Sequence, residues 1–318
     1  MRPGPSLAGG VLRPVVAAGA ALAALAGCVQ AAVRAGPEPG GGPAVPELAS
    51  VTSFTYVLQG YPDGRLDTIA RSPHRLAIVD LSRDGTAAGF FTREEIARVR
   101  ATGKLMLAYF EIGSIEEFRT DFRAVDRDLL LHTWPDWPDE HFARYWEERW
   151  WDQVVRPRLD RALAAGFDGV YLDTPLAYEE IDLAAVPGET RATLGRKMAD
   201  LVIRISRYAK QRRPGFAIVP QNSPELRHFT GYPEAIDGIG MEELFFRATD
   251  VPCREDWCRQ NLADALALKS LGKAVLATDY AVDPANIEAA CARYRRHATA
   301  GNVTVVDLDR VSPPCEPQ

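Results

Sequence analysis

The chain lacks the residues and motifs that mark several large enzyme classes. Its five histidines are scattered without the spacing of metal ligands, which argues against a zinc-dependent deacetylase. No Gly-x-Ser-x-Gly or Walker motif occurs, so neither a nucleophile elbow nor a phosphate-binding loop is expected. Gly238-Ile239-Gly240 lacks the third glycine of a dinucleotide-binding loop. The formal net charge of −6 provides no attraction toward nucleic acid or anionic lipid.

The N-terminal region has no acidic residue through Gly27, and its apolar run from Val15 to Ala26 is too short to span a bilayer. Arg2 and Arg13 precede most of this run, as in a secretory signal. Leu25-Ala26-Gly27-Cys28 resembles a bacterial lipobox, in which the cysteine becomes the lipidated first residue. We therefore predict a signal peptide over residues 1–27, lipidation at Cys28, and an extracytoplasmic protein anchored to a bacterial membrane. Plain secretion is the alternative.

Residues 28–50 are rich in Ala, Gly and Pro and show no apolar periodicity, which predicts a flexible tether. Residues 51–318 have the usual size of one α/β barrel. Beyond Cys28, an exported chain would hold an even number of cysteines, which favours disulfides: Cys253, Cys258, Cys291 and Cys315. The short spacing of the first two favours Cys253–Cys258 with Cys291–Cys315, although spacing alone leaves the pairing open.

Eight short apolar runs in the rest of the chain alternate with helix-like stretches. The runs are Tyr56–Leu58, Leu76–Val79, Leu105–Phe110, Val170–Leu172, Ala217–Val219, Ile239–Met241, Ala274–Ala277 and Val303–Val306. Polar residues follow them: Gln59, Asp80, Glu111, Asp173, Gln221 with Asn222, Glu242, Asp279 with Tyr280, and Asp307. This pattern predicts a single-domain (β/α)8 TIM-like barrel, whose strand ends converge on one face. An open doubly wound sheet would give a similar alternation.

Helices are expected where apolar residues recur at helical spacing. Thr92 and Glu95 form a capping-box pattern at one start. The other predicted helices are residues 140–165 with a break at Pro157, 190–213, 254–271 and 283–300. Five of the six tryptophans lie between Trp134 and Trp151. Trp146 and Trp150 are expected to pack toward the barrel, and Trp134 or Trp137 to be the exposed one.

Asp173 and Glu242 end the predicted fourth and sixth strands, and we expect them on opposite sides of one mouth. Glycoside hydrolysis needs such a pair, with one acid to protonate the leaving oxygen and one carboxylate as nucleophile or base. Any single strand-end acid has a simpler explanation, because such residues also cap loops and helices. Several converging acids favour a catalytic site.

Longer motifs resemble glycoside hydrolase family 114 in order along nearly the whole chain. They include residues 78–85, 91–96, 107–119, 167–173, 221–222, 236–244 and 277–280. The resemblance implies a (β/α)8-type barrel and an endo-α-1,4-polygalactosaminidase activity. It also implies Asp173 and Glu242 as the catalytic pair, with a polar lining near Asp80, Tyr109, Asn222 and Tyr280. To that lining we add four residues at the strand ends: Gln59, Glu111, Gln221 and Asp279.

Two positions depart from the family pattern. Glu111 stands where many relatives have a small residue, and an extra carboxylate there would alter substrate preference or a neighbouring pKa. Glu243 directly follows Glu242, so the second acid is open to a one-residue slip, which would turn its side chain to the other face. Counting from Asp237 favours Glu242.

We therefore expect a lipid-anchored monomeric glycosidase that binds a galactosamine-containing polysaccharide or oligosaccharide and no nucleic acid. The expected chemistry needs no cofactor or metal. A partly deacetylated galactosamine chain is cationic, which fits an acidic mouth. The alternatives are a non-catalytic glycan-binding envelope lipoprotein, or an enzyme of the same fold that acts on another glycan.

Overall fold

The computed structural model of the chain describes residues 46–315. The predicted signal peptide, Cys28 and most of the predicted tether lie outside these residues. The end of the tether is instead helix α1, Pro46–Ala49, and Leu48 packs with the residues of the barrel interior. The folded domain therefore begins before Val51, the predicted start. Among the described residues, no helix combines the length and apolarity that crossing a membrane requires.

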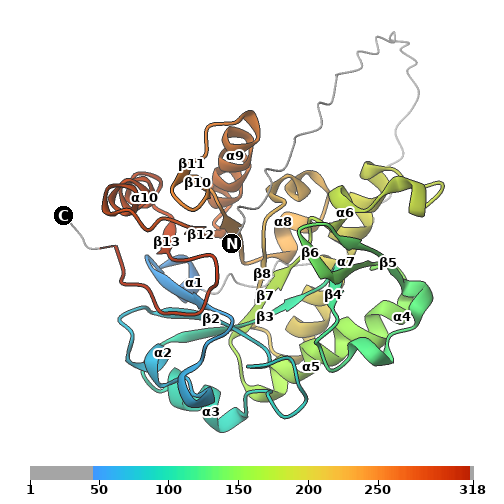
Figure 1. Cartoon of the computed structure of the whole chain (residues 1–318), viewed down its shortest axis with the longest axis horizontal. Coiled ribbons are helices and arrows are strands. Elements are labelled where there is room, and N and C mark those ends of the chain that lie inside the picture. Colours follow the sequence, from blue (N-terminus) through green and yellow to red (C-terminus); the bar gives the residue numbers. More distant parts are fainter. Residues whose placement is uncertain (1–45, 316–318) are drawn as a thin grey trace, which may run out of the picture.

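Eight parallel strands form the centre of the molecule, with their C-terminal ends at one mouth (Figure 1). They are β1 Phe54–Val57, β2 Leu76–Asp80, β3 Leu105–Glu111, β7 Gly169–Asp173, β8 Ala217–Pro220, β9 Gly238–Glu242, β12 Ala274–Asp279 and β13 Ala300–Val303. Five pair in the order β1-β2-β3-β7-β8 and three in the order β13-β12-β9. Single parallel bridges join the two sheets, Ser53 to Gly301 and Gln221 to Gly240. The predicted (β/α)8 barrel is confirmed.

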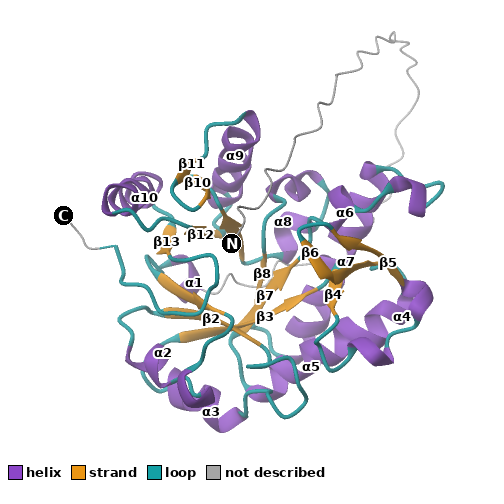
Figure 2. Cartoon of the chain, viewed as in Figure 1, coloured by secondary structure: helices purple, strands orange, loops and turns teal. Residues whose placement is uncertain are grey.

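Helices surround the strands, as Figure 2 shows. They are α2 Asp67–Arg71, α3 Arg93–Arg100, α4 Glu148–Trp150, α5 Arg156–Ala165, α6 Ala177–Glu180, α7 Arg191–Arg212, α8 Tyr232–Ala235, α9 Asp256–Ser270 and α10 Pro284–His297. The capping box is confirmed, because the Thr92 side chain accepts from the Glu95 N–H while the Glu95 carboxylate accepts from the Thr92 N–H. Both predicted disulfides, Cys253–Cys258 and Cys291–Cys315, are present.

Two antiparallel insertions follow the C-terminal ends of strands and therefore lie on the mouth side of the barrel. The first follows β3 and contains β4 Ser114–Glu116, β5 Leu130–Trp134 and β6 Trp137–Ala143. The second follows β9 and contains β10 Phe246–Ala248 and β11 Val251–Pro252. Trp137, at the turn of the first insertion, is 59% exposed, as predicted for Trp134 or Trp137.

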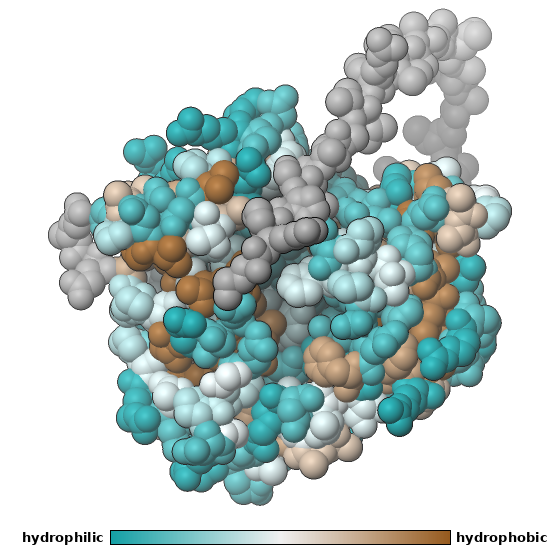
Figure 3. Space-filling model, viewed as in Figure 1, coloured by the Kyte–Doolittle hydropathy of each residue, from teal (hydrophilic) through white to brown (hydrophobic). Residues whose placement is uncertain are grey.

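The core has two layers because side chains alternate along each strand. Alternate residues such as Tyr56, Ile78 and Tyr171 fill the barrel interior. Their neighbours, such as Ala77, Val79 and Val170, pack outward against the helices. Hydrophilic side chains dominate the outer face in view, with apolar groups in separate patches (Figure 3). The alternation decides which strand-end residues point into the mouth.

The predicted helix over residues 140–165 is wrong at its start. Residues 137–143 form β6, and helical structure begins only at Glu148. Trp146 therefore lies before the helix, whereas Trp150 is buried and donates from Nε1 to the Ile112 carbonyl at 2.8 Å. The predicted break at Pro157 is a π-helical segment, Trp151–Val155, which directly precedes α5. Antiparallel pairing with the hairpin partner β5 and with the more distant β4 decides the strand.

The last strand begins three residues earlier than predicted. Helix α10 ends at His297, because Ala298 adopts a left-handed conformation with φ 50°. Ala300–Val303 then forms β13, whereas the prediction placed the strand at Val303–Val306. Gly301 was expected to follow the helix, but it lies in the strand under the Tyr294 ring. A Cβ at Gly301 would stand 2.1 Å from Cδ2 of that ring, so only glycine fits.

Candidate active site

The predicted catalytic carboxyl groups end two barrel strands separated by only one other. Asp173 is the last residue of β7 and Glu242 the last of β9, with β8 between them. They therefore lie on adjacent walls of the mouth, and the prediction that they lie on opposite sides is wrong. The negative charge of Asp173 also acts on Glu242 and raises its pKa.

The chain turns sharply after each of these three strands. Thr174, Asn222 and Glu243 have positive φ values of 60°, 59° and 54°. Non-glycine residues rarely adopt this conformation, which costs on the order of 1–3 kcal/mol each and clusters at functional sites. Two of these strained residues, Thr174 and Glu243, directly follow the residues that carry the two carboxyl groups.

Asp173 is held by two hydrogen-bond donors. The Tyr109 hydroxyl donates to Oδ2, and the Thr174 N–H donates to Oδ1 at 2.6 Å. Burial raises the pKa of Asp173 to about 6, even though both donors favour the ionised form. Asp173 is thus a carboxylate that titrates just below neutral pH, with its charge already solvated by protein donors.

Glu242 has the higher pKa of the two. The Tyr280 hydroxyl donates to Oε1 at 2.6 Å, and the Glu242 N–H donates to Oδ1 of Asn222 at 3.0 Å. Burial and the charge of Asp173 raise the pKa of Glu242 to about 7, whereas hydrogen bonds from Tyr280 and Gln221 lower it. Glu242 therefore retains a proton at a pH where Asp173 is mostly ionised. Two carboxyl groups with separated pKa values have the electrostatics of an acid and a base.

Glu243, the other candidate for the second acid, lies outside this arrangement. Its N–H donates to the Thr278 carbonyl at 2.8 Å. Its pKa is raised to about 8 by burial and by the charges of Glu242 and Asp279. The contacts with Tyr280 and Asn222 belong to Glu242 alone, which favours Glu242.

Tyrosines that the sequence analysis did not select form the floor beneath the pair. The Tyr56 hydroxyl donates to Oε1 of Gln221 at 3.3 Å, and the Tyr56 and Tyr171 rings lie 5.2 Å apart. The Tyr171 hydroxyl is buried and has no hydrogen-bond partner within residues 46–315. A Cβ at Gly240 would stand 2.0 Å from that hydroxyl. Packing against Tyr171 therefore explains this glycine, and no nucleotide-binding role is needed. The sequence does contain a signal for Tyr171, because it lies two residues before Asp173 and therefore on the same face of the strand.

Asp80 and Glu111 are not free acids, contrary to the predicted acidic mouth. Arg119 contacts both oxygens of Asp80 at 2.8 Å and also pairs with Glu111. Arg158 binds the second oxygen of Glu111 at 2.7 Å. Burial alone would raise the pKa of Glu111, but the two guanidinium groups outweigh it and hold that pKa well below its usual range. Glu111 therefore adds no free negative charge to the mouth.

Hydrogen bonds connect the first insertion to Thr174, whose hydroxyl donates to the main-chain carbonyl of Asp173 at 2.8 Å. Ser114 donates to Glu140 at 2.5 Å and also lies 2.9 Å from Oγ1 of Thr174. Burial and nearby negative charges raise the pKa of Glu140 to about 8. Glu140 lies at the start of the predicted helix over residues 140–165, so its place beside the mouth follows only from the fold.

Two predicted lining residues point elsewhere. Gln59 is exposed and donates to the Asp307 carbonyl at 2.7 Å. Asp279 is fully buried on the outward side of β12, where protein donors occupy its carboxylate. The structure brings six predicted residues together at the mouth: Tyr109, Asp173, Gln221, Asn222, Glu242 and Tyr280.

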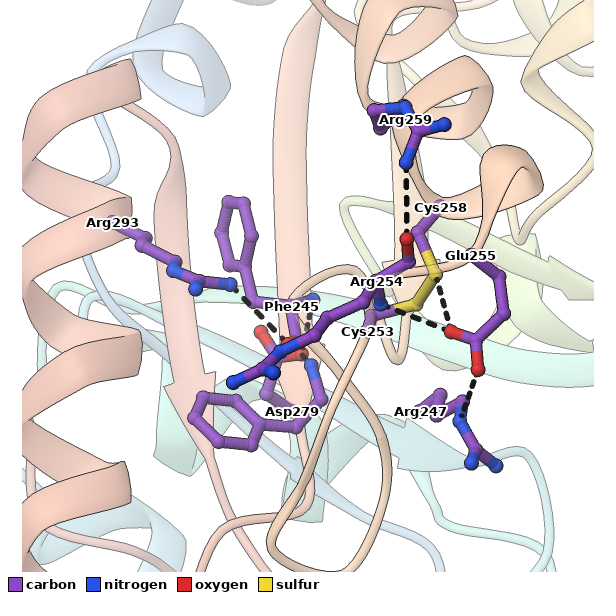
Figure 4. Close-up of a disulfide and its surroundings, with 10 residues drawn as sticks. Phe245, Arg247, Cys253, Arg254, Glu255, Cys258, Arg259, Asp279 and Arg293 are labelled. Carbon is purple, nitrogen blue, oxygen red and sulfur yellow. Dashed lines mark hydrogen bonds and ion pairs between the residues drawn. A yellow bond between two sulfur atoms is a disulfide. The ribbon is translucent and has the colours of Figure 1, made fainter.

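Within the described part of the chain, one cluster has the residue types of a metal site: Cys253, Glu255 and Cys258 (Figure 4). Its sulfur atoms form a disulfide, so they offer no thiolate to a metal ion. Glu255 instead pairs with Arg247 at 2.8 Å. The disulfide and this ion pair give the cluster a structural role.

An eight-stranded barrel with paired carboxyl groups at its strand ends is the architecture of many glycosidases. The profile of "Glycoside-hydrolase family GH114" matches residues 37–318, and the chain belongs to this family. Family membership supports a glycosidase and implies a carbohydrate substrate.

Relatives by sequence include an uncharacterized protein of Deinococcus radiodurans, 31% identical over 271 residues and covering 84% of each chain. An uncharacterized protein of Thermotoga maritima is 30% identical over 221 residues, covering 68% of this chain and 67% of its own.

Two solved structures share the fold. Ega3 of Aspergillus fumigatus, in complex with galactosamine, superposes with a TM-score of 0.65 at 17% identity, over 85% of this chain and 96% of its own. The glycoside hydrolase domain of PelA from Pseudomonas aeruginosa gives 0.62 at 16% identity, over 82% and 96%.

Proposed function

We propose that the protein hydrolyses an α-1,4-linked, galactosamine-rich polysaccharide, with Asp173 and Glu242 as its catalytic pair. The observation that carries this proposal is the pair itself. Two carboxyl groups on neighbouring walls of one mouth have pKa values raised to about 6 and about 7, and each accepts a hydrogen bond from its own tyrosine.

Glu242 is the proposed general acid, because its higher pKa keeps it protonated at neutral pH. Its proton passes to the glycosidic oxygen as the bond from that oxygen to the anomeric carbon breaks. Asp173 is the proposed nucleophile or base. Its carboxylate either attacks the anomeric carbon or removes a proton from the attacking water. Tyr109 and the Thr174 N–H favour the ionised form that either role requires.

The proposed substrate is cationic at the amines of deacetylated galactosamine. Support comes from the family and from Ega3, whose structure was solved with galactosamine. Further support comes from carboxyl groups that follow β7 and β8. Glu179 in α6 and Glu225 in the short helix Pro224–His228 both contact the Tyr178 hydroxyl, and burial raises the pKa of Glu225 to about 7. Neither carboxyl group forms an ion pair with an arginine or lysine of residues 46–315.

A same-fold glycosidase that acts on another glycan is the second candidate. The observation in its favour is Arg119, which places a cation beside Glu111 where an acidic surface was expected. A non-catalytic glycan binder is less favoured, because binding alone does not require two carboxyl groups with separated pKa values.

The test is release of reducing ends from deacetylated α-1,4-galactosamine oligomers by the full chain. Asp173→Asn and Glu242→Gln should each lower kcat at least about 100-fold, since general acid–base groups contribute about 10²–10⁴. Glu243→Gln is the matched control and should retain activity. Binding without turnover would favour the binder, and turnover of only a different glycan would favour the second candidate.

We also propose that the protein is extracytoplasmic and lipid-anchored through Cys28. The lipobox-like sequence Leu25-Ala26-Gly27-Cys28 and two disulfides, which persist in oxidising compartments, support this proposal. Cys28→Ser should move the protein from the membrane fraction of a bacterial host to the soluble fraction. Unchanged membrane association of the variant would contradict the anchor.

A further inference from the structure

Asp279 ends β12 on the strand face opposite to the mouth. Val275 and Ala277, two and four residues earlier, pack in the outer layer, and Asp279 follows them toward the helices with 0% of its surface exposed. Its Oδ1 accepts hydrogen bonds from the Phe245 N–H at 2.7 Å and the Phe246 N–H at 2.8 Å. Its Oδ2 accepts one from the Tyr294 hydroxyl at 2.8 Å. These three donors engage both oxygens of the carboxylate.

The two N–H groups bound by Asp279 belong to the loop that leaves Glu242. Phe245 and Phe246 are three and four residues beyond the proposed acid, after the strained turn at Glu243. The same loop is held again at Phe245, whose carbonyl accepts from the Cys253 N–H at 2.8 Å and from Arg293 at 3.3 Å. Figure 4 shows Asp279, Phe245 and Arg293 side by side, next to the disulfide.

The residue that follows β12 contacts the strand end from which this loop leaves. Tyr280 points into the mouth and donates to Glu242 at 2.6 Å. One strand end therefore holds the Glu242 carboxyl group with Tyr280 and the backbone behind it with Asp279. A shift of the loop along β12 would break both contacts together.

We infer that Asp279 is a positioning residue, which fixes the loop after Glu242 and so preserves the Glu242–Tyr280 hydrogen bond, and that it does not bind substrate. This inference rests on the proposed role of Glu242 as the acid. A residue on the outer side of β12 thereby supports the proposed acid on the inner side of the barrel.

Asp279→Asn and Asp279→Ala separate positioning from substrate binding. Asparagine keeps an oxygen for the two N–H groups, so kcat and KM should stay within about threefold of the parent. Alanine removes it, and kcat should fall at least about tenfold with little change in KM, because both N–H groups lose their acceptor and the loop is no longer held. The alkaline limb of the pH profile should also move upward, because Tyr280 lowers the pKa of Glu242.

A substrate-binding role predicts the opposite result. Asn and Ala would then raise KM for a cationic oligomer alike, because both remove the charge, and the alkaline limb would stay in place. That outcome would overturn the inference, and the Asn variant alone is enough to detect the change in KM if the Ala variant fails to fold.

Amide hydrogen exchange tests the same tether without using activity. The Phe245 and Phe246 amides should lose protection in Asp279→Ala and keep it in Asp279→Asn. Tyr294→Phe is the control, because it removes the partner of Oδ2 and a contact with the Asn302 carbonyl but leaves the two N–H groups on Oδ1. Unchanged protection in the Ala variant would refute the tether. A parent that turns over no galactosamine oligomer would refute the proposed function instead, while the exchange result still decides the role of Asp279.

Discussion

Two regions of the mouth bind their carboxyl groups with different partners, and the groups are buried in the first region and partly buried in the second. At β2 and β3, Asp80 and Glu111 are bound by the guanidinium groups of Arg119 and Arg158. At β7 and β9, Asp173 and Glu242 are bound by tyrosine hydroxyls, backbone and amide groups, with no arginine or lysine in contact among the described residues. The pKa of Glu111 is lowered, whereas those of Asp173 and Glu242 are raised. The pKa of Asp80 is also raised, because burial outweighs its single guanidinium partner, so only the two arginines at Glu111 reverse the effect of burial.

The largest expected effect follows from removing the buried guanidinium group of Arg119. Arg119→Met leaves Asp80 and Glu111 with one guanidinium fewer in a buried site, so the free energy of unfolding should fall by about 3–5 kcal/mol. Urea denaturation measures the change. The matched control is Arg149→Met, which breaks exposed pairs with Asp126 and Asp128 and should leave the midpoint almost unchanged. Equal small effects would show that the arginine-bound region is not held by its charges.

Substitution by glutamine should change the free energy of unfolding in opposite directions at Glu111 and at Glu242. Glu111 has a lowered pKa in the folded state, so its charge stabilises the fold above its unfolded pKa and this stability is lost on acidification. Glu111→Gln should therefore destabilise the protein at pH 8, by about 1.5–3 kcal/mol for the lost charged hydrogen bonds.

Glu242 has a raised pKa, so the stability of its protonated form is present at low pH and is lost as the pH rises through about 7. Glu242→Gln should therefore stabilise the protein at pH 8 and leave it unchanged at pH 4. Denaturation at the two pH values measures both variants. Destabilisation by Glu242→Gln at pH 8 would contradict the raised pKa of Glu242.

The pH dependence of kcat/KM should be a narrow bell. Activity needs Asp173 ionised and Glu242 protonated, so it should fall about tenfold per pH unit below about 6 and again above about 7. The two groups interact, so the limbs belong to the pair. A flat profile between pH 5 and pH 9 would exclude these two groups as the acid and base.

The smallest expected effects come from the two tyrosines. Tyr109→Phe removes a donor to Asp173 and should raise the acid limb, whereas Tyr280→Phe removes a donor to Glu242 and should raise the alkaline limb. Each shift should be about one pH unit or less, since one hydrogen bond contributes about 0.5–1.5 kcal/mol. Pre-steady-state or steady-state pH profiles of both variants measure the shifts. Movement of the same limb in both would break the one-to-one pairing of tyrosine and acid.

Much of the fold was predictable because its signals are local. The eight apolar runs identify the barrel strands, since parallel strands covered by helices are apolar on both faces. The capping box at Thr92 and the short spacing of Cys253 and Cys258 also have local causes. The exceptions were residues 137–143 and Ala300–Val303, where strand pairing and the Tyr294 ring override a helical pattern.

The candidate site was predictable only in part. Asp173 and Tyr109 meet because β3 and β7 pair in register, with Glu111 opposite Asp173. Alternation along β12 could have separated Asp279 from Tyr280, because neighbouring strand residues face opposite sides. No pattern places Arg119 on Asp80, since the arginine follows β4 in an insertion and the aspartate ends β2.

The amino-acid sequence by itself determined the family, the barrel and the strand-end positions of Asp173 and Glu242, because these follow from local periodicity and motif order. Tertiary structure alone decided which carboxyl groups have arginine partners and which have tyrosines. Those partners come from segments distant in the chain, and the energy of a buried charge depends on what lies within a few ångströms of it.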